Sequence, residues 1–415
     1  MAACGGGSEE SGGSSSGGSG STSLKIGDVV ALTGPAAEFG PSWDKAAKIA
    51  VEEGNAAAKE AGLSFNADIS AADEGSSPQT AVAATRKLVA EGSNCVLGGL
   101  AFSIPMAEGV TIPGEVPQIT PATTSPLYSE LHAKGGFTFR TIPSDAFGDQ
   151  MLADYLVNVL GGAKGKLISV AARDDSYGAP AAEAFVEAWQ ERGGETQGPV
   201  LYNPNATSYD AEAAKIVANN PAAFVIFDEP GTYAKVGAAL LRTGSFDASK
   251  LYSTSGFPSE IPPGTPPAAL EGAHFVNPGV PPGGKALEGF EKAFASSSLE
   301  PKKMQPYSQN NYDGAVICML AAAAAKSSEG SAIAKQIPEV TKKGAPEFTY
   351  GQLRQAFEAI KAGKPIFYNA LSGSTPFDEN GDPTSTIAAV TEYKNGKLVQ
   401  VGQLELTAGG KLIEK

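Results

Sequence analysis

The sequence predicts an α/β protein that contains two doubly wound parallel sheets. The first supporting observation is an alternation of short apolar runs with helical patterns, which begins at Leu24. Strands separated by helices form parallel sheets that are covered on both faces. The second observation is that the alternation restarts after Arg140, which indicates a second unit of similar size. With 415 residues and 42% hydrophobic residues, the chain can bury a core in each unit.

Each expected strand of the first unit is a short apolar run. Each expected helix repeats small or apolar residues at spacings of three and four, as on the buried face of a helix. A further helix is expected between the last two strands. The strands are 24–32, 63–69, 95–97 and 116–120, and the other helices are 42–61 and 78–91.

The second unit repeats the alternation of strands and helices beyond Arg140. A segment of different composition follows it. The Pro- and Gly-rich stretch 258–284 favours extended, loop-like backbone. Asn395-Gly396 indicates a tight hairpin near the C-terminus. The expected strands are 166–172, 200–203, 223–228, 251–254, 365–370, 386–393 and 397–404, and the expected helices are 147–160, 179–192, 209–218, 233–242, 285–294, 307–326 and 350–361.

Charge and composition exclude several classes of function. A formal net charge of −14 disfavours a nucleic-acid partner, because phosphate binding needs clustered Lys and Arg. The two histidines are far apart, and no two cysteines share a C-x-x-C spacing, so neither a His-rich metal site nor a thiol redox motif is expected. Cys95 and Cys318 are expected either as separate buried residues or as a pair. No apolar run reaches the 18 residues expected of a membrane span.

Residues 1–23 are mostly Gly and Ser and are expected to form a flexible tether. Met1-Ala2-Ala3-Cys4 resembles the end of a bacterial lipoprotein signal, in which small residues precede a cysteine that receives a lipid. Cys4 is therefore the expected lipid attachment residue. The alternative is that this segment is a linker or a dispensable tail.

Motifs for catalysis are missing from the sequence. The run 161–166 lacks the first Gly and the final Ser or Thr of a phosphate-binding P-loop. There is no G-x-S-x-G nucleophile elbow. The acidic turn 378–382 has its Gly at the wrong position for a calcium loop. We therefore expect no enzyme activity, no catalytic residue, no metal and no cofactor.

Polar loops follow several expected strands, at the edge where open α/β sheets bind ligands. Their order resembles that of the type I periplasmic binding proteins, specifically the branched-chain amino acid and amide binding group of ABC transporters. The resemblance covers about residues 24–405. The matching pieces are LTGPAAEFG, VEEGNAA, GGLAFS, TPATTSP, FRTIPSD, DDSYG and FDENGD.

The resemblance implies two lobes that hinge closed on a small polar ligand, with chain crossings near Pro143, Ala273 and Pro383. The lobes would comprise 24–143 plus 274–382, and 144–273 plus 383–415. It also implies a monomer outside the cytoplasm that serves an ABC permease complex in the membrane. A ligand-sensing receptor module that transports nothing would have the same fold and is the alternative.

The resemblance also assigns binding residues. Ser103, Ala122 and Thr124 would hold the carboxylate and amino group of a ligand, because hydroxyls and free backbone N–H groups coordinate a carboxylate. Phe39 and Phe102 would line the pocket, and Tyr177 would be the aromatic contact of the second lobe. The structural alternatives are a helix cap at Ser103, a turn at Thr124, and plain packing for Phe39 and Tyr177.

One departure from the family concerns the ligand. Amino acid binders of this group place an acid after the strand expected at 251–254, whereas residues 253–257 contain none. Asp228 or Glu229 could replace it, or could cap the helix that follows. An amino acid, an amide and another small carboxylate therefore all remain open.

Overall fold

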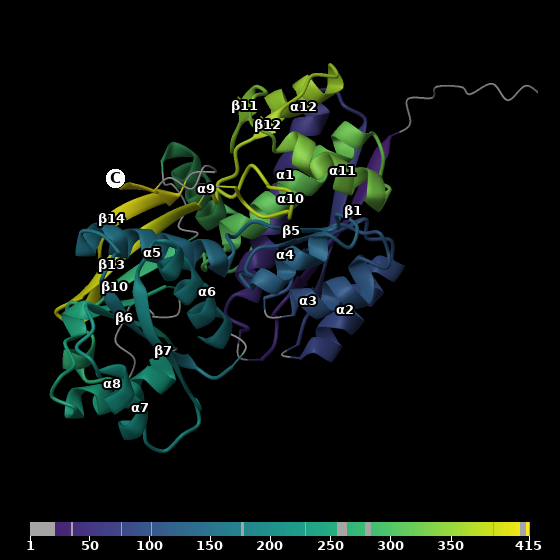
Figure 1. The fold of residues 1–415 in the computed structure, drawn as a ribbon. Helices are drawn as coiled ribbons and strands as arrows, with labels where there is room; N and C mark the ends of the chain where they lie inside the picture. The colour runs from purple at the N-terminus through teal and green to yellow at the C-terminus, as the bar shows by residue number, and fades with distance from the viewer. Residues whose placement is uncertain are drawn as a thin grey trace, which may run out of the picture.

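The computed structural model describes residues 21–34, 36–75, 77–100, 102–175, 178–228, 230–254, 264–278, 284–384, 386–406 and 412–414. Two lobes lie side by side, each built on its own sheet (Figure 1). The chain passes between them three times: between β5 and α5, between β10 and α9, and between β12 and β13. The fold class expected from the sequence is confirmed.

The first lobe is built on a five-stranded parallel sheet in the order β2-β1-β3-β4-β5. Leu24, Ile26 and Val29 are fully buried in the first strand, because helices cover both faces of a parallel sheet. The strands are β1 (Thr22–Val30), β2 (Phe65–Asp73), β3 (Cys95–Gly98), β4 (Gln118–Thr120) and β5 (Thr138–Arg140).

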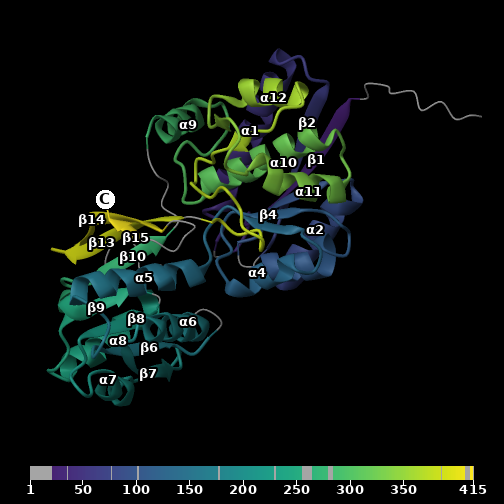
Figure 2. The ribbon, with the colours of Figure 1, turned by 45° about the horizontal axis from the view of Figure 1, so that its top comes forward.

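Helices from distant parts of the chain cover this sheet (Figures 1 and 2). One apolar cluster joins the sheet to the helices α1 (Gly40–Glu60), α9 (Lys285–Ser296), α10 (Ser308–Ala325), α11 (Gly330–Val340) and α12 (Leu353–Lys361). Smaller clusters hold α2 (Pro78–Ala90), α3 (Ser103–Met106), a π-helical turn (Ala107–Thr111) and α4 (Pro126–His132). A two-stranded sheet pairs β11 (Glu347–Phe348) with β12 (Phe367–Tyr368).

α10 is the central helix of the first lobe, and residues 308–323 are all buried. Its Ala-rich sequence lets α1, α11 and α12 pack closely around it. Among the described residues no single helix is long and apolar enough to cross a membrane, although α10 and α11 together meet that test with a bend of 107° between them.

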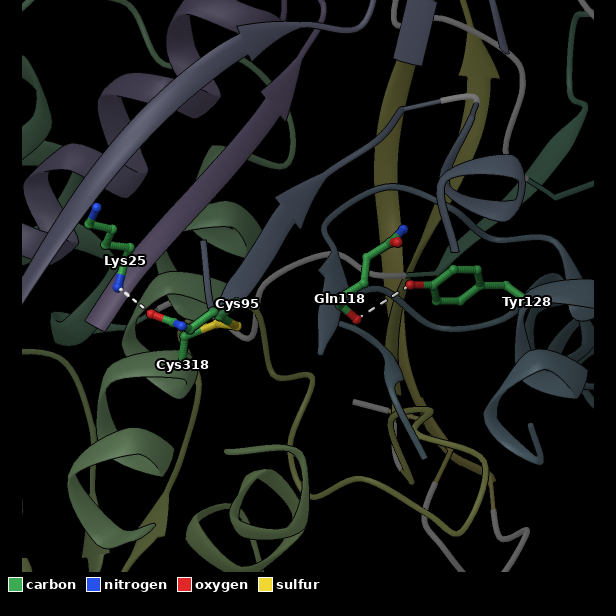
Figure 3. The surroundings of a disulfide bond; sticks show 6 residues. Lys25, Cys95, Gln118, Tyr128 and Cys318 are labelled. Carbon is green, nitrogen blue, oxygen red and sulfur yellow. Dashed lines mark hydrogen bonds between the residues drawn. A yellow bond between two sulfur atoms is a disulfide. The ribbon is translucent and has the colours of Figure 1, made fainter. Parts of the chain in front are cut away.

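Cys95 and Cys318 form a disulfide that ties β3 to α10 (Figure 3). Both residues are fully buried, and their Cα atoms lie 6.3 Å apart. Of the two alternatives that the sequence left open, the structure has the pair.

The second lobe is built on an eight-stranded sheet in the order β15-β14-β13-β10-β9-β8-β6-β7. Strands β6 to β10 pair in parallel, and β13, β14 and β15 extend the sheet from β10 by antiparallel pairing. The strands are β6 (Leu167–Arg173), β7 (Glu195–Tyr202), β8 (Ala223–Phe227), β9 (Leu251–Ser253), β10 (His274–Pro278), β13 (Thr386–Lys394), β14 (Lys397–Leu406) and β15 (Leu412–Glu414).

In the described part of the chain, helices cover both faces of the second sheet. Those on one face are α5 (Asp145–Leu160) and α6 (Gly178–Glu191), and those on the other are α7 (Asp210–Ile216) and α8 (Pro230–Arg242). Short 3-10 turns form at Ala248–Lys250 and Pro267–Ala269. The hairpin expected at Asn395-Gly396 is confirmed, since both residues have positive φ and link β13 to β14.

One expected boundary is wrong. The stretch 258–284 was expected as loop, and residue 274 was expected to begin the return to the first lobe. Instead β10 pairs with β9 and β13 in the second sheet. Phe275 and Val276 of this strand are buried, and burial requires their backbone groups to be paired. The chain therefore leaves the second sheet only after Pro278.

Candidate functional site

A cavity of about 200 Å³ lies between the two lobes at the ends of β3 and β4. Parallel α/β sheets bind ligands at this edge. A larger cavity of about 780 Å³ lies instead where β1 and β2 begin. The cleft cavity is lined by Leu100, Ile104, Ala122, Thr123, Thr124, Ser125 and Pro126 of the first lobe and by Asp145, Asp149, Pro180 and Ala181 of the second.

Buried hydroxyl groups shape the first-lobe wall after β4. Thr120 Oγ1 accepts from the backbone N–H of Thr123 at 3.3 Å and lies 3.5 Å from that of Ala122. The Thr123 hydroxyl donates to Ser103 Oγ at 2.6 Å, and Ser103 Oγ donates to Gly99 O at 2.7 Å. These bonds hold the loops after β3 and β4 together and give the wall a fixed backbone conformation.

Arg140 at the end of β5 holds the same loop from behind. Its guanidinium donates to the backbone oxygens of Thr123 at 3.2 Å and Ser125 at 3.0 Å. Asp382 pairs with it through two bonds of 2.5 and 2.8 Å. Because Arg140 is fully buried, this two-point pairing compensates a charge that would otherwise be strongly unfavourable.

The first turn of α5 forms the opposite wall of the cavity. The helix α5 begins next to the first lobe (Figure 2). Thr124 Oγ1 donates to Asp145 Oδ2 at 2.8 Å, and the backbone N–H of Asp145 donates to Thr124 O at 2.9 Å. Burial raises the pKa of the Asp145 carboxyl, while the Thr124 hydrogen bond and the charge of Arg140 oppose that rise. This contact connects the two walls at one end of the cavity.

Asp149 lies one helical turn further along α5 and lines the same cavity. Its side chain is 1% exposed, and neither carboxylate oxygen has a hydrogen-bond partner among the described residues. Burial, and then the nearby charge of Asp145, raise the pKa of Asp149 well above the ordinary value. A buried carboxyl without a partner is costly for a protein to keep.

Two of the residues expected from the sequence line the cavity, namely Ala122 and Thr124. Ser103 is fully buried behind the wall and reaches it through Thr123. It does not cap a helix through its side chain: its hydroxyl bonds back to the loop after β3.

The other expected residues lie elsewhere. Phe39 is half-buried and packs against Trp43, with ring centroids 6.1 Å apart. Phe102 is half-buried against the apolar cluster under α2 and α3. Asp228 is fully buried and accepts from Tyr202 Oη at 2.8 Å, so it does not line this cavity. The remaining three, Cys4, Tyr177 and Glu229, lie outside the described residues.

Sequence reasoning missed the acidic wall of the cavity. Arg140 and Asp145 stand inside the matching piece FRTIPSD, which could have drawn attention to them. Asp149 carries no signal in the sequence, because its burial depends on how α5 lies against the first lobe. In the described part of the chain, no group of three or more His, Cys, Asp or Glu is placed to hold a metal ion.

The family model for periplasmic binding proteins matches residues 23–363. Leu/Ile/Val-binding protein homolog 3 of Brucella melitensis is 32% identical over 177 residues, which is 41% of this chain and 45% of that protein. The chemotactic signal transduction system substrate-binding protein BasB of Halobacterium salinarum is 24% identical over 288 residues, which is 68% of this chain and 64% of that protein. The matches thus span about half to two thirds of these relatives.

Solved structures share the fold over nearly the whole chain. The leucine-binding protein LivK of Thermotoga maritima has a TM-score of 0.66 at 20% identity, with 92% and 98% of the two chains covered. LivJ of Streptococcus pneumoniae, in complex with isoleucine, has a TM-score of 0.65 at 18% identity, with 95% of this chain and 100% of that chain covered. A solute-binding protein of R. palustris, in complex with benzoate, has a TM-score of 0.61 at 17% identity, with 92% of this chain and 96% of that chain covered. Since the family model matches most of its length, the chain belongs to the periplasmic binding protein family.

Proposed function

We propose that this protein is the solute-binding component of an ABC importer and that it works outside the cytoplasm. The observation that carries the proposal is the cleft cavity, which has one wall from each lobe and lies at the ligand-binding edge of the first sheet. Relatives named for binding leucine, isoleucine and valine support it. The cavity of about 200 Å³ suits a ligand smaller than the drug-sized molecules that fill pockets of roughly 300–1,000 Å³.

The proposed mechanism is hinge closure. A small polar ligand binds first to the loop after β4, at Ala122 and Thr124. The lobes then close about the three chain crossings, and the α5 wall completes the site. The ligand stabilises the closed form because only that form contacts it from both sides. The permease complex in the membrane then receives the ligand.

Several residues outside the cavity wall also have proposed roles in ligand binding. Ser103 supports the binding loop through Thr123. A closed form would bring further side chains of both lobes to the ligand, and the candidates are Phe39, Phe102, Tyr177, Asp228 and Glu229. We expect a monomer with no catalytic residue and no cofactor.

The test is calorimetry on the purified protein with a panel of amino acids, their amides and small carboxylates. We expect at least one micromolar or tighter ligand, and Thr124→Val should weaken its binding about tenfold by removing a polar contact. Thr85→Val is the matched control, since Thr85 is a buried threonine of α2 whose hydroxyl donates to Ala81 O of its own helix, away from the cavity. No binding by any member of the panel, together with no small molecule released on denaturation, would refute the function.

Ligand sensing without transport is the second candidate, and one relative favours it because its name places it in a chemotactic signal transduction system. Uptake of radiolabelled ligand separates the two functions. Deletion of the gene should abolish high-affinity uptake if the protein serves an importer, whereas a sensor would leave uptake intact and remove only the response to the ligand.

We also propose that Cys4 carries a lipid that anchors the Gly- and Ser-rich tether of residues 1–23 to the membrane. Expression of Cys4→Ser behind a full secretion signal should move the protein from the membrane fraction to the soluble fraction. Unchanged membrane association of this variant would contradict the anchor.

A further inference from the structure

The cleft cavity has an acidic wall, and one of its two carboxylates, Asp149, has no partner among the described residues. Its first-lobe lining consists of apolar residues and neutral Thr and Ser side chains, so the charged groups in the wall are Asp145 and Asp149. Their spacing of four residues puts both on one face of α5. An arrangement of this kind has a net negative charge facing the place where a ligand would lie.

The two carboxylates differ in their surroundings. Asp145 is held by Thr124 at 2.8 Å and lies within the electrostatic reach of Arg140. Asp149 is deeper, at 1% exposure, and both of its oxygens are without a partner among the described residues. Of the two carboxylates, Asp149 is therefore the one that still needs a hydrogen-bond donor or a positive charge beside it.

The nearby arginines are engaged with other groups. Arg140 is paired with Asp382 and with two backbone oxygens of the binding loop. Arg192 pairs with Asp154 at 2.6 Å, on another part of α5. Among the described residues no Lys, Arg or His pairs with Asp149, and the one charged group that acts on it is Asp145, so the complementary charge has to come from the ligand.

We propose that the natural ligand carries a cationic nitrogen group, an ammonium or amidinium, and that Asp149 is the residue that pairs with it. The proposal rests on the function proposed above and names the ligand class for the same cleft. A zwitterion fits best: its carboxylate faces the neutral loop after β4, and its cation faces α5. Asp149 then supplies the acid that residues 253–257 lack.

The experiment compares ligands that differ only in charge. Calorimetry is run with L-leucine, its deaminated analogue 4-methylpentanoate and its decarboxylated analogue 3-methylbutylamine, and with the same three forms of phenylalanine and glutamine. For the best-binding set, the form without the nitrogen cation should bind the native protein at least about 30-fold more weakly, as expected when a buried charge loses its partner.

The variant Asp149→Asn keeps the shape of the side chain and removes its charge. This variant should bind the cationic forms about 30-fold more weakly than the native protein does. It should also bind the cationic forms and the deaminated analogue with similar affinity. Asp154→Asn is the control, because Asp154 lies on the same helix, pairs with Arg192 and does not line the cavity. Circular dichroism of both variants verifies that the fold is intact.

Mass spectrometry of the small molecule released from protein purified out of its host extract covers ligands outside the panel. A released ligand with a basic nitrogen supports the proposal. A tight ligand without one, or a cationic ligand that Asp149→Asn binds as well as the native protein does, overturns it and leaves the solute-binding function standing. Absence of any bound or binding small molecule overturns both.

Discussion

The interior of the first lobe and the wall of the cleft bury carboxylates in opposite ways. Asp313 of α10 accepts from Tyr368 Oη at 2.7 Å and from the backbone N–H groups of Leu371 and Ser372 at 3.1 and 2.8 Å. Among the described residues, Asp28 of β1 accepts from Asn311 Nδ2 alone, at 3.2 Å. Asp149 at the cleft has no partner among the described residues.

The pKa of each of these three carboxyls is raised, and hydrogen bonds to the carboxylate oppose the rise. Burial raises the pKa of Asp313 to about 6, because its hydrogen bonds offset part of the desolvation. Burial and the charge of Asp44 raise the pKa of Asp28 to about 7, with Asn311 opposing them. The pKa of Asp149 is raised well above its ordinary value with no hydrogen bond opposing it. A buried carboxyl that the fold itself satisfies is structural, whereas one left unsatisfied beside a cavity is suited to a ligand.

The largest effect is expected for Asp313→Ala. The substitution leaves the Tyr368 hydroxyl and two buried backbone N–H groups without an acceptor, at about 1–3 kcal/mol each, so the free energy of unfolding should fall by about 3–5 kcal/mol. Urea denaturation measures it. Glu379→Ala, in an exposed turn, is the control and should change that energy by less than about 0.5 kcal/mol. Equal effects of both variants would contradict the structural role of Asp313.

A smaller effect is expected for Asp28→Asn, and it depends on pH. Because the folded state raises the pKa of Asp28 from 3.8 to about 7, the native protein favours the protonated form. The stability contributed by this group is complete below about pH 4 and is lost as the pH rises to about 7. Above pH 7 the variant should be the more stable protein by about 2–4 kcal/mol, and near pH 4 the two should converge. Unfolding curves that stay parallel from pH 4 to 8 would show that Asp28 is not the titrating group.

The smallest effect is expected for the stability of Asp149→Asn without ligand. Removing an unpaired buried charge should raise the free energy of unfolding at pH 7 by about 1–2 kcal/mol, less than at Asp28, because the new amide also finds no partner. The gain should vanish below about pH 4, where the aspartate is neutral in both the folded and the unfolded protein. Thermal unfolding at the two pH values measures this difference. A loss of stability at pH 7 would indicate that Asp149 has a structural partner.

The sequence predicts the order of strands and helices well because local signals carry it. Apolar runs mark the buried strands, and Asn395-Gly396 adopts the positive φ values that its turn needs. The strand at 274–278 is missed because prolines crowd its surroundings, while its pairing with β13 joins residues more than a hundred positions apart. Such long-range pairing leaves no local pattern.

The candidate site is predicted only in part for the same reason. Ala122 and Thr124 follow a recognisable strand, and they line the cavity. Asp149 is one of three aspartates on α5, with Asp145 and Asp154, and nothing in the local pattern separates them. Only the packing of α5 beside the first lobe buries one of them beside a cavity, without a partner among the described residues.

The disulfide between Cys95 and Cys318 gives the chain an unusual covalent topology. Its two ends are 223 residues apart in sequence, so the ring that it closes contains the chain from α5 to β10, which is most of the second lobe. A single proteolytic cut anywhere within that ring leaves both fragments attached to each other. Nicked protein should therefore migrate as one species on a non-reducing gel and as two after reduction.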